Sequence, residues 1–283
     1  MSANRASMTT LKRRVLSYIP SEIIALLGAL VVWQVAVTVF HVPPYLFPGL
    51  DVVLREIWFR PEYYLMQSLY TLGNTLIAFA LSVVIGVALA VAIVYSRFLE
   101  KTLYAVLIAF NSVPKVALAP LFVIWLGTGN PSKIGMAFMI SLFAIVIDSV
   151  LGLRSLNPDV VDLGRSLRGS RVKMLLKLRL PNALPSIFSG MKVAMSLSLV
   201  GVIVGEFIAA QQGLGFVVLS AQGMFRTDRV FAAVFLLAVI GTALFYTMEY
   251  LERKLIPWHE SHRSRHNDST PAPVGVVPII PTP

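Results

Sequence analysis

The stretch that decides the fold reads Val161-Asp162-Leu163-Gly164-Arg165-Ser166-Leu167-Arg168-Gly169-Ser170, followed farther along by Leu180-Pro181. It is basic, has apolar residues at helical spacing, and lies between two strongly apolar segments. Loops between membrane spans need only connect, so a loop of about 35 residues with its own helical pattern predicts a docking surface. We expect residues 154–188 to receive a soluble partner on the side of the membrane where positive charge collects.

Composition places the chain in a membrane. Of its 283 residues 57% are apolar and only 13% are charged, whereas a soluble domain carries about twice that charged fraction. The net charge of +10 does not indicate nucleic acid, because the Lys and Arg are spread along loops without interleaved aromatic residues. Cysteine is absent, which excludes disulfides, thiolate metal sites and a cysteine nucleophile.

Apolar runs long enough to cross a hydrocarbon core of roughly 30 Å occur at 23–42, 70–95, 103–126, 134–153, 189–210 and 230–251. The first follows a basic triplet as in a signal peptide, but it is too long and lacks a cleavage site, so we expect a retained helix. Most of the 24 Lys and Arg fall in the N-terminus, 96–102, 154–188 and the tail, whereas Lys133 falls in an outer loop. The positive-inside rule then predicts an all-α protein with six transmembrane helices and both termini in the cytoplasm.

Four regions follow from this topology. We expect a cytoplasmic N-terminus at 1–20, a first transmembrane helix with a periplasmic segment at 21–66, a core with spans 2–6 at 67–256, and a disordered Pro-rich tail at 257–283.

The long loop has its own internal order. Asn157-Pro158-Asp159 predicts a helix start, because it combines a capping side chain, a first-turn proline and an acid at the positive end of the helix dipole. Val160, Leu163 and Leu167 then share one face. Gly169 predicts a bend, and a second helical stretch leads to Pro181 and Pro185, which should close it. From composition alone, a helix lying on anionic lipid explains the loop equally well.

The loop resembles the cytoplasmic "EAA" loop of ABC-importer permeases, E-A-A-x3-G-x9-I-x-L-P. Asp162 stands at the Glu position, Leu163 and Gly164 at the two Ala positions, and Leu178 at the Ile position, before Leu180-Pro181. The glycine comes one place late, with Arg168 in its position. By this resemblance the residues that couple the chain to an ATPase are Asp162, Leu163, Gly164, Arg165, Ser166, Leu167, Arg168, Gly169, Leu180 and Pro181.

Three flanking motifs extend the likeness to about residues 22–256: Asn-Ser-Val-Pro-Lys-Val-Ala-Leu-Ala-Pro-Leu at 111–121, Trp-Leu-Gly-Thr-Gly at 125–129 and Gly-Glu-Phe at 205–207. They are similar to permeases of the aliphatic sulfonate, taurine and nitrate group, which also contains importers of pyrimidine vitamin precursors. The resemblance implies the type I permease fold, a homodimer in a bacterial inner membrane, two copies of a cytoplasmic ATPase, and a periplasmic solute-binding protein.

No G-x-x-x-x-G-K-[ST] loop is present in the sequence, so the chain has no phosphate cradle of that kind. We therefore expect ATP and Mg²⁺ on the partner ATPase and no cofactor bound by this chain.

Ionisable residues inside spans usually face a cavity or a partner. Lys115, between Pro114 and Pro120, Glu206 and the polar Asn111 are candidate pathway residues, with Lys115 and Asn111 attracting an anion. Alternatively, Lys115 neutralises Glu206 or caps free carbonyls. Asp148 is expected to be an interfacial anchor.

Small residues recur every four positions at Ser82, Gly86 and Ala90 and again at Gly190, Ala194 and Ser198. This spacing lets helix backbones approach closely. Most should pack within the chain. The resemblance implies that one face of the core forms the dimer, and the fifth predicted span is the preferred candidate. Residues 128–131 and 211–215 are predicted to be turns on the periplasmic side. They either contact a binding protein or only connect two helices.

Two other classes of protein fit the sequence less well. An ion- or proton-coupled secondary transporter would use Glu206 and Asp148 as relay groups, but it would commonly show repeated halves and would not need a docking loop. A membrane-embedded enzyme would need clustered catalytic groups, yet His41 stands alone and the other histidines lie in the tail, at His259, His262 and His266.

Overall fold

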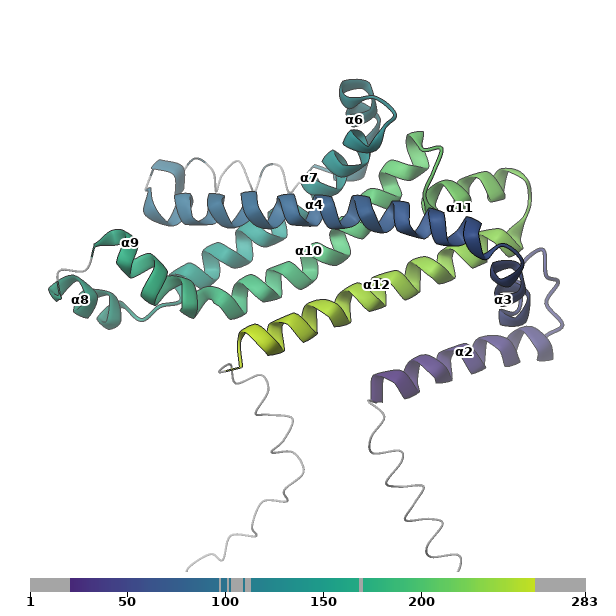
Figure 1. The fold of residues 1–283 in the computed structure, drawn as a ribbon, viewed down its shortest axis with the longest axis horizontal. Coiled ribbons are helices and arrows are strands. Elements are labelled where there is room, and N and C mark those ends of the chain that lie inside the picture. The colour runs from purple at the N-terminus through teal and green to yellow at the C-terminus, as the bar shows by residue number, and fades with distance from the viewer. Residues whose placement is uncertain are drawn as a thin grey trace, which may run out of the picture. The chain divides into compact units, whose positions relative to one another are not determined.

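The computed structural model describes residues 21–96, 98–100, 102, 109, 113–167 and 170–257, and every regular element in these ranges is helical (Figure 1). The all-α prediction is confirmed. In chain order the elements are α2 (Ser21–Val39), α3 (Leu50–Phe59), α4 (Pro61–Tyr95), the 3₁₀-helix η1 (Lys115–Leu118), α6 (Ala119–Leu126), α7 (Asn130–Arg154), α8 (Pro158–Ser166), α9 (Arg171–Met174), the π-helix η2 (Leu175–Arg179), α10 (Leu180–Ala209), α11 (Leu214–Gly223) and α12 (Thr227–Leu255).

Four stretches are long and apolar enough to cross a membrane: Pro61–Tyr95, Asn130–Arg154, Arg171–Ala209 and Thr227–Leu255. They match the spans predicted second, fourth, fifth and sixth. The predicted first span is present as α2. Of the third, the structure describes mainly Lys115–Leu126, so the count of six crossings and their orientation stay predictions. The predicted N-terminal segment 1–20 and almost all of the tail lie outside the described residues.

The chain forms two compact units. The first combines Met1–Thr75, Leu118–Met136 and Leu199–Gly241, and the second combines Leu76–Ala117, Ala137–Ser198 and Thr242–Pro283. Helices α4, α7, α10 and α12 each contribute one part to either unit.

The first unit has an apolar core of buried side chains from α3, α4, α11 and α12, namely Val53, Tyr64, Leu214, Val217, Ala232 and Ala233. Helix α2 joins this core through Trp33, whose ring lies 5.7 Å from that of Phe47 and 6.0 Å from that of Phe231. Gln34 of α2 accepts a hydrogen bond from the Leu50 N–H at 2.7 Å and so fixes the start of α3.

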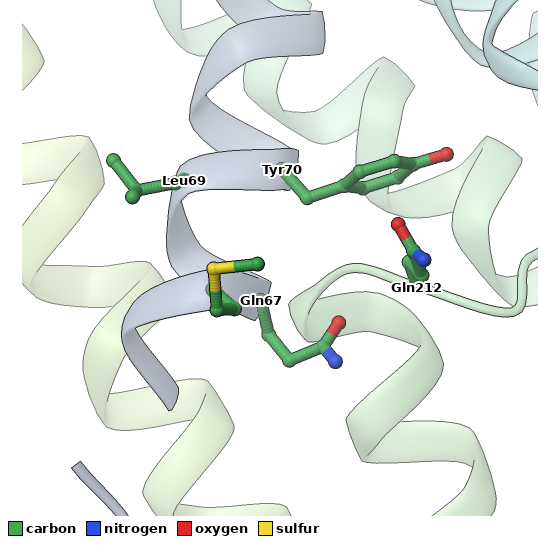
Figure 2. A pocket seen from close by; sticks show the side chains of 5 residues that line it. Gln67, Leu69, Tyr70 and Gln212 are labelled. Carbon is green, nitrogen blue, oxygen red and sulfur yellow. The ribbon is translucent and has the colours of Figure 1, made fainter. Parts of the chain in front are cut away.

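A pocket of about 360 Å³ also lies in the first unit, lined by Met66, Gln67, Leu69, Tyr70 and Gln212. Figure 2 shows the Tyr70 ring and the Gln67 side chain pointing from α4 toward the side of Gln212, which belongs to the loop before α11. One helix and one loop therefore form the walls.

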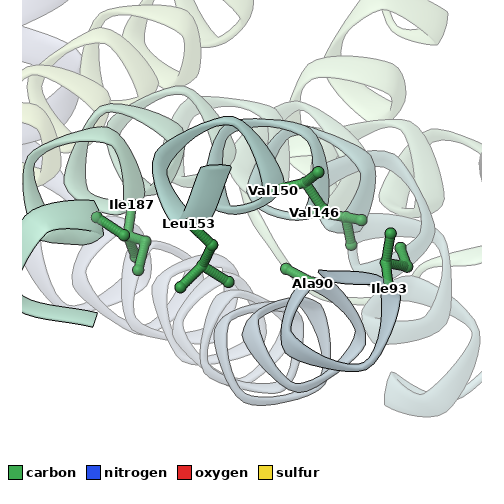
Figure 3. Packing of buried hydrophobic residues seen from close by; sticks show 7 residues of the cluster. Ala90, Ile93, Val146, Val150, Leu153 and Ile187 are labelled. Atoms are coloured by element: carbon green, nitrogen blue, oxygen red, sulfur yellow. The ribbon is translucent and has the colours of Figure 1, made fainter. Parts of the chain in front are cut away.

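The second unit is built by small residues that let α4 and α10 approach α7. Ser82 and Ser141 place their hydroxyl oxygens 2.7 Å apart, and a Cβ on Gly86 would lie 2.8 Å from Ile145. Farther along, Ala90 and Ile93 meet Val146, Val150, Leu153 and Ile187 in one buried cluster (Figure 3). The small residues Ser82, Gly86 and Ala90, here called the stripe of α4, therefore approach a neighbouring helix closely, as predicted. That neighbour belongs to the same chain.

The stripe of α10 is used in the same way. A Cβ on Gly190 would lie 2.8 Å from the Cβ of Asp148, and both Ala194 and Ser198 are fully buried. These three residues therefore pack within the chain, as expected for most of the small residues. The dimer face on the fifth predicted span stays a prediction, and Val193 and Val200 of α10 leave another face of this helix exposed.

The two prolines of the long loop do not close a segment. One helical run continues from Arg171 to Ala209 and includes Pro181 and Pro185. A proline within an α-helix lacks its N–H and clashes with the carbonyl one turn back. The π-helix η2 precedes Pro181, and the Leu180 N–H donates to the carbonyl of Leu175, five residues back. This wider turn changes the register in which Pro181 enters α10.

Candidate coupling surface and pathway residues

Helix α8 begins where the sequence predicted. The Asn157 side chain accepts a hydrogen bond from the Asp159 N–H at 2.9 Å, and the Asn157 carbonyl accepts from Val160 at 3.1 Å. Pro158 occupies the first position of the helix, where its missing N–H costs nothing. The helix start is therefore encoded locally.

One side of α8 packs against the segment that leads into α10. Val161 is only 9% exposed, and a Cβ on Gly164 would lie 3.3 Å from the Cδ1 of Leu178. Gly164 occupies an Ala position of the loop motif and Leu178 its Ile position. The contact gives a physical reason for a small residue at the first position and an aliphatic residue at the second.

The other side of α8 is apolar and uncovered. Leu163 is 61% exposed and Leu167 75%, and Val160 is also exposed. Val172 and Leu176 add exposed apolar side chains on α9 and η2, between the exposed Arg171, Lys173 and Lys177. We call the five apolar residues Val160, Leu163, Leu167, Val172 and Leu176 the coupling surface.

Polar contacts brace the base of this segment. Arg154 pairs with Glu100 at 2.8 Å, and Asn182 donates to Ser155 at 2.9 Å. Tyr95, at the end of α4, donates its hydroxyl to the Arg171 carbonyl at 3.2 Å and lies under the Arg179 guanidinium. The sequence alone does not reveal these bracing residues, because only the fold brings them together.

Some predicted residues of the site lie outside the described residues: Arg168 and Gly169 of the loop, and Asn111 of the pathway. The bend at Gly169 therefore stays a prediction. Ser166 hydrogen-bonds back to the Asp162 carbonyl at 3.0 Å, which closes the last turn of α8. Leu180 and Pro181 are the first two residues of α10.

Lys115 lies at a break in regular helix, as predicted. It opens η1 directly after the non-helical Pro114, and Pro120 stands in the first turn of α6. Its Nζ atom lies 4.7 Å from the centroid of the Phe143 ring, a cation–π contact within the second unit.

Glu206 is buried, with 1% of its surface exposed, and its partners belong to its own unit. Thr71 donates its hydroxyl to the carboxylate at 2.9 Å, and the Gly215 N–H donates at 2.8 Å. Buried polar groups need such partners, and Glu206 therefore has hydrogen-bond donors that compensate for the burial of its carboxylate.

Lys133 differs from its predicted place in an outer loop. It lies in the first turn of α7 and is 2% exposed, with Nζ 2.9 Å from the Tyr70 hydroxyl. Tyr70 in turn donates to Asn130. The lysine follows Asn130 and Pro131 and therefore looks like a loop residue, whereas the Tyr70 ring and hydroxyl provide a partner that allows its burial.

Comparisons with known proteins agree with this architecture. The family described as "Binding-protein-dependent transport system inner membrane component" matches residues 82–257. The riboflavin transport system permease of Chloroflexus aurantiacus is 33% identical over 84% of this chain and 90% of its own. The formylaminopyrimidine transport permease of Halalkalibacterium halodurans is 30% identical, over 82% and 92%. The taurine transport system permease of Escherichia coli is 29% identical, over 81% and 86%.

A solved structure shows the same fold. A chain of the MetNI methionine ABC transporter, in an inward-facing conformation, superposes with a TM-score of 0.62 at 17% identity, over 69% of this chain and 98% of that one. The match to the family spans more than half of this chain, including the loop that carries the coupling surface. The chain therefore belongs to the family of binding-protein-dependent transport system inner membrane components.

Proposed function

We propose that the chain forms the solute pathway of an ATP-driven importer in a bacterial inner membrane. It acts as a homodimer with two copies of a cytoplasmic ATPase and receives its solute from a periplasmic binding protein. The observation that carries the proposal is the coupling surface: exposed leucines on a short helix whose other side and base are fixed. A loop that faces only water or lipid does not need an exposed apolar helix that is held in place by packing and polar contacts.

The ATPase subunits bind ATP and Mg²⁺ and supply the energy. This chain contributes a rigid connection. Movement of α8 is transmitted through the Gly164–Leu178 contact to η2, which continues without interruption into α10. A closely packed contact is bistable rather than continuously deformable, so displacement of α8 shifts the transmembrane helix with it.

The proposed solute is a sulfonate, taurine, nitrate or a vitamin precursor, as the resemblance of the sequence implies. Lys115 supports an anionic solute, because its positive charge lies beside a break in regular helix. Asn111 and Lys115 are proposed to line the pathway, whereas Glu206 is proposed to support the pathway region from a buried position without contact to the solute.

The experiment is co-purification of the ATPase with the tagged chain, extracted in mild detergent. Leu163→Asp places a charge in the contact and should weaken ATPase binding roughly 30-fold, as expected for a central interface residue. Met224→Asp is the matched control, because Met224 is a similarly exposed apolar residue in the turn between α11 and α12. Equal recovery of the ATPase with both variants would overturn the assignment.

A further inference from the structure

The N-terminus of α11 is held by three side chains from other helices. Three successive backbone N–H groups donate outward: Gly213 to Gln67 at 2.5 Å, Leu214 to the Thr71 hydroxyl at 2.8 Å, and Gly215 to the Glu206 carboxylate at 2.8 Å. Thr71 also donates its own proton to Glu206, so two of the three acceptors are hydrogen-bonded to each other. We call Gln67, Thr71 and Glu206 the α11 cap.

The cap is closely packed as well as hydrogen-bonded. Gly213 has φ +107°, and a Cβ there would lie 2.2 Å from Glu206 Oε1. A Cβ on Gly215 would lie 2.8 Å from the Cβ of Glu206. Position 213 requires glycine, because a side chain there would be strained at this φ and would overlap the carboxylate. The Glu206 carboxylate therefore packs directly against both glycines.

The start of α11 is buried, so its backbone N–H groups need acceptors from the protein. Helix α11 has ten apolar-rich residues and reaches only about 15 Å, half the thickness of the hydrocarbon core. A short helix of this kind exposes backbone N–H groups at its start. Where protein excludes water, such groups cost free energy unless they are hydrogen-bonded, and the cap supplies an acceptor for each of the three.

The same geometry determines one wall of the pocket in Figure 2. Gln212 directly precedes the first capped residue, Gly213, while Gln67 belongs to both the cap and the pocket lining. On the opposite wall, Lys133 and Asn130 hold the Tyr70 hydroxyl. The cap therefore fixes the position of Gln212 relative to Tyr70.

We propose that Gln67, Thr71 and Glu206 are positioning residues for transport, which hold α11 and Gln212 in place through hydrogen-bond acceptance. The negative charge of Glu206 is not required for this role. The proposal rests on the transport function proposed above, and it separates Glu206 from a relay group, for which a titrating carboxyl is essential.

The test uses the full chain assembled with its ATPase in lipid nanodiscs. Thr71→Val removes the central acceptor, and Thr75→Val is the matched control, because Thr75 is equally buried on α4 but donates only to the carbonyl of Thr71 in its own helix. We expect amide hydrogen exchange at residues 213–215 to become about tenfold faster with Thr71→Val and to stay unchanged with Thr75→Val.

A second readout follows the pocket wall. Because the chain has no native cysteine, Gln212→Cys gives a single site for a maleimide dye. Thr71→Val should change its labelling rate severalfold, and binding-protein-stimulated ATP hydrolysis should fall in parallel. Equal exchange and labelling rates in the two threonine variants would overturn the proposal, as would normal stimulation despite a loosened cap.

Glu206 supplies the decisive pair of variants. Glu206→Gln keeps an acceptor oxygen and should retain protection of residues 213–215 and stimulated hydrolysis, whereas Glu206→Leu should lose both. If Glu206→Gln is as defective as Glu206→Leu, charge is needed and the proposal is wrong. Failure of the wild-type chain to bind an ATPase would instead contradict the transport function, and amide exchange in the isolated chain would still report on the cap.

Discussion

Helices α8 and α11 are nearly equal in length, nine and ten residues, yet they are stabilised in opposite ways. Helix α8 is capped by its own neighbour, Asn157, and leaves apolar side chains uncovered. Helix α11 buries Leu214, Val217 and Ala221, and its start is capped by side chains of other helices, with Thr71 lying 143 residues from Leu214. The first arrangement suits a helix that docks to another protein, and the second suits a helix fixed within its own chain.

The largest effect is expected at the α11 cap. Gly213→Ala forces a Cβ into the Glu206 carboxylate at a left-handed backbone position and should destabilise the first unit by about 3 kcal/mol. The measurement is the apparent Tm of the purified chain, which should fall by roughly 10 °C. Gly223→Ala, at the other end of α11, is the control, because a Cβ there meets nothing within 4 Å. Similar Tm values for the two variants would show that the cap is not tight.

A smaller effect is expected at the start of α8. Asn157→Ala removes the local cap and should cost about 1 kcal/mol of helix stability, which would weaken ATPase binding roughly fivefold. Asn157→Ser should restore most of the binding, since serine caps nearly as well. ATPase titration against nanodisc-reconstituted chain provides the measurement. An Asn157→Ala chain with unchanged affinity would show that α8 is held by its packed side alone.

The smallest effect is expected at the brace between Arg154 and Glu100. Both side chains are half-exposed, and exposed ion pairs contribute about 0–1 kcal/mol. Glu100→Gln should therefore shift the Tm by no more than about 2 °C and leave ATPase binding intact. A loss of binding as large as that of Leu163→Asp would mean that this pair, rather than the coupling surface, controls docking.

The sequence predicts locally determined features, such as the start of α8, but not contacts between distant residues, such as those that cap α11. Residues 157–159 start α8 because capping is a local property, and apolar runs predicted the long helices because they need no partner to be recognised. The stripes Ser82-Gly86-Ala90 and Gly190-Ala194-Ser198 predicted close approach but not the neighbour, and both contact their own chain. The passage of α10 through Pro181 was missed, since it depends on the π-helical turn before it. The partners of Glu206 and the burial of Lys133 were also missed, because Thr71, Gly215 and Tyr70 come together only in the folded chain.

The central claim is that α8 docks to an ATPase, and site-directed cross-linking in native membranes tests it most directly. The chain has no native cysteine, so Leu167→Cys carries a single thiol at the most exposed position of the coupling surface, and Met224→Cys serves as the control. With a thiol-reactive photo-cross-linker, we predict that position 167 captures an ATP-binding subunit and position 224 does not. Absence of any ATPase adduct at position 167, with the chain intact in the membrane, would contradict the account.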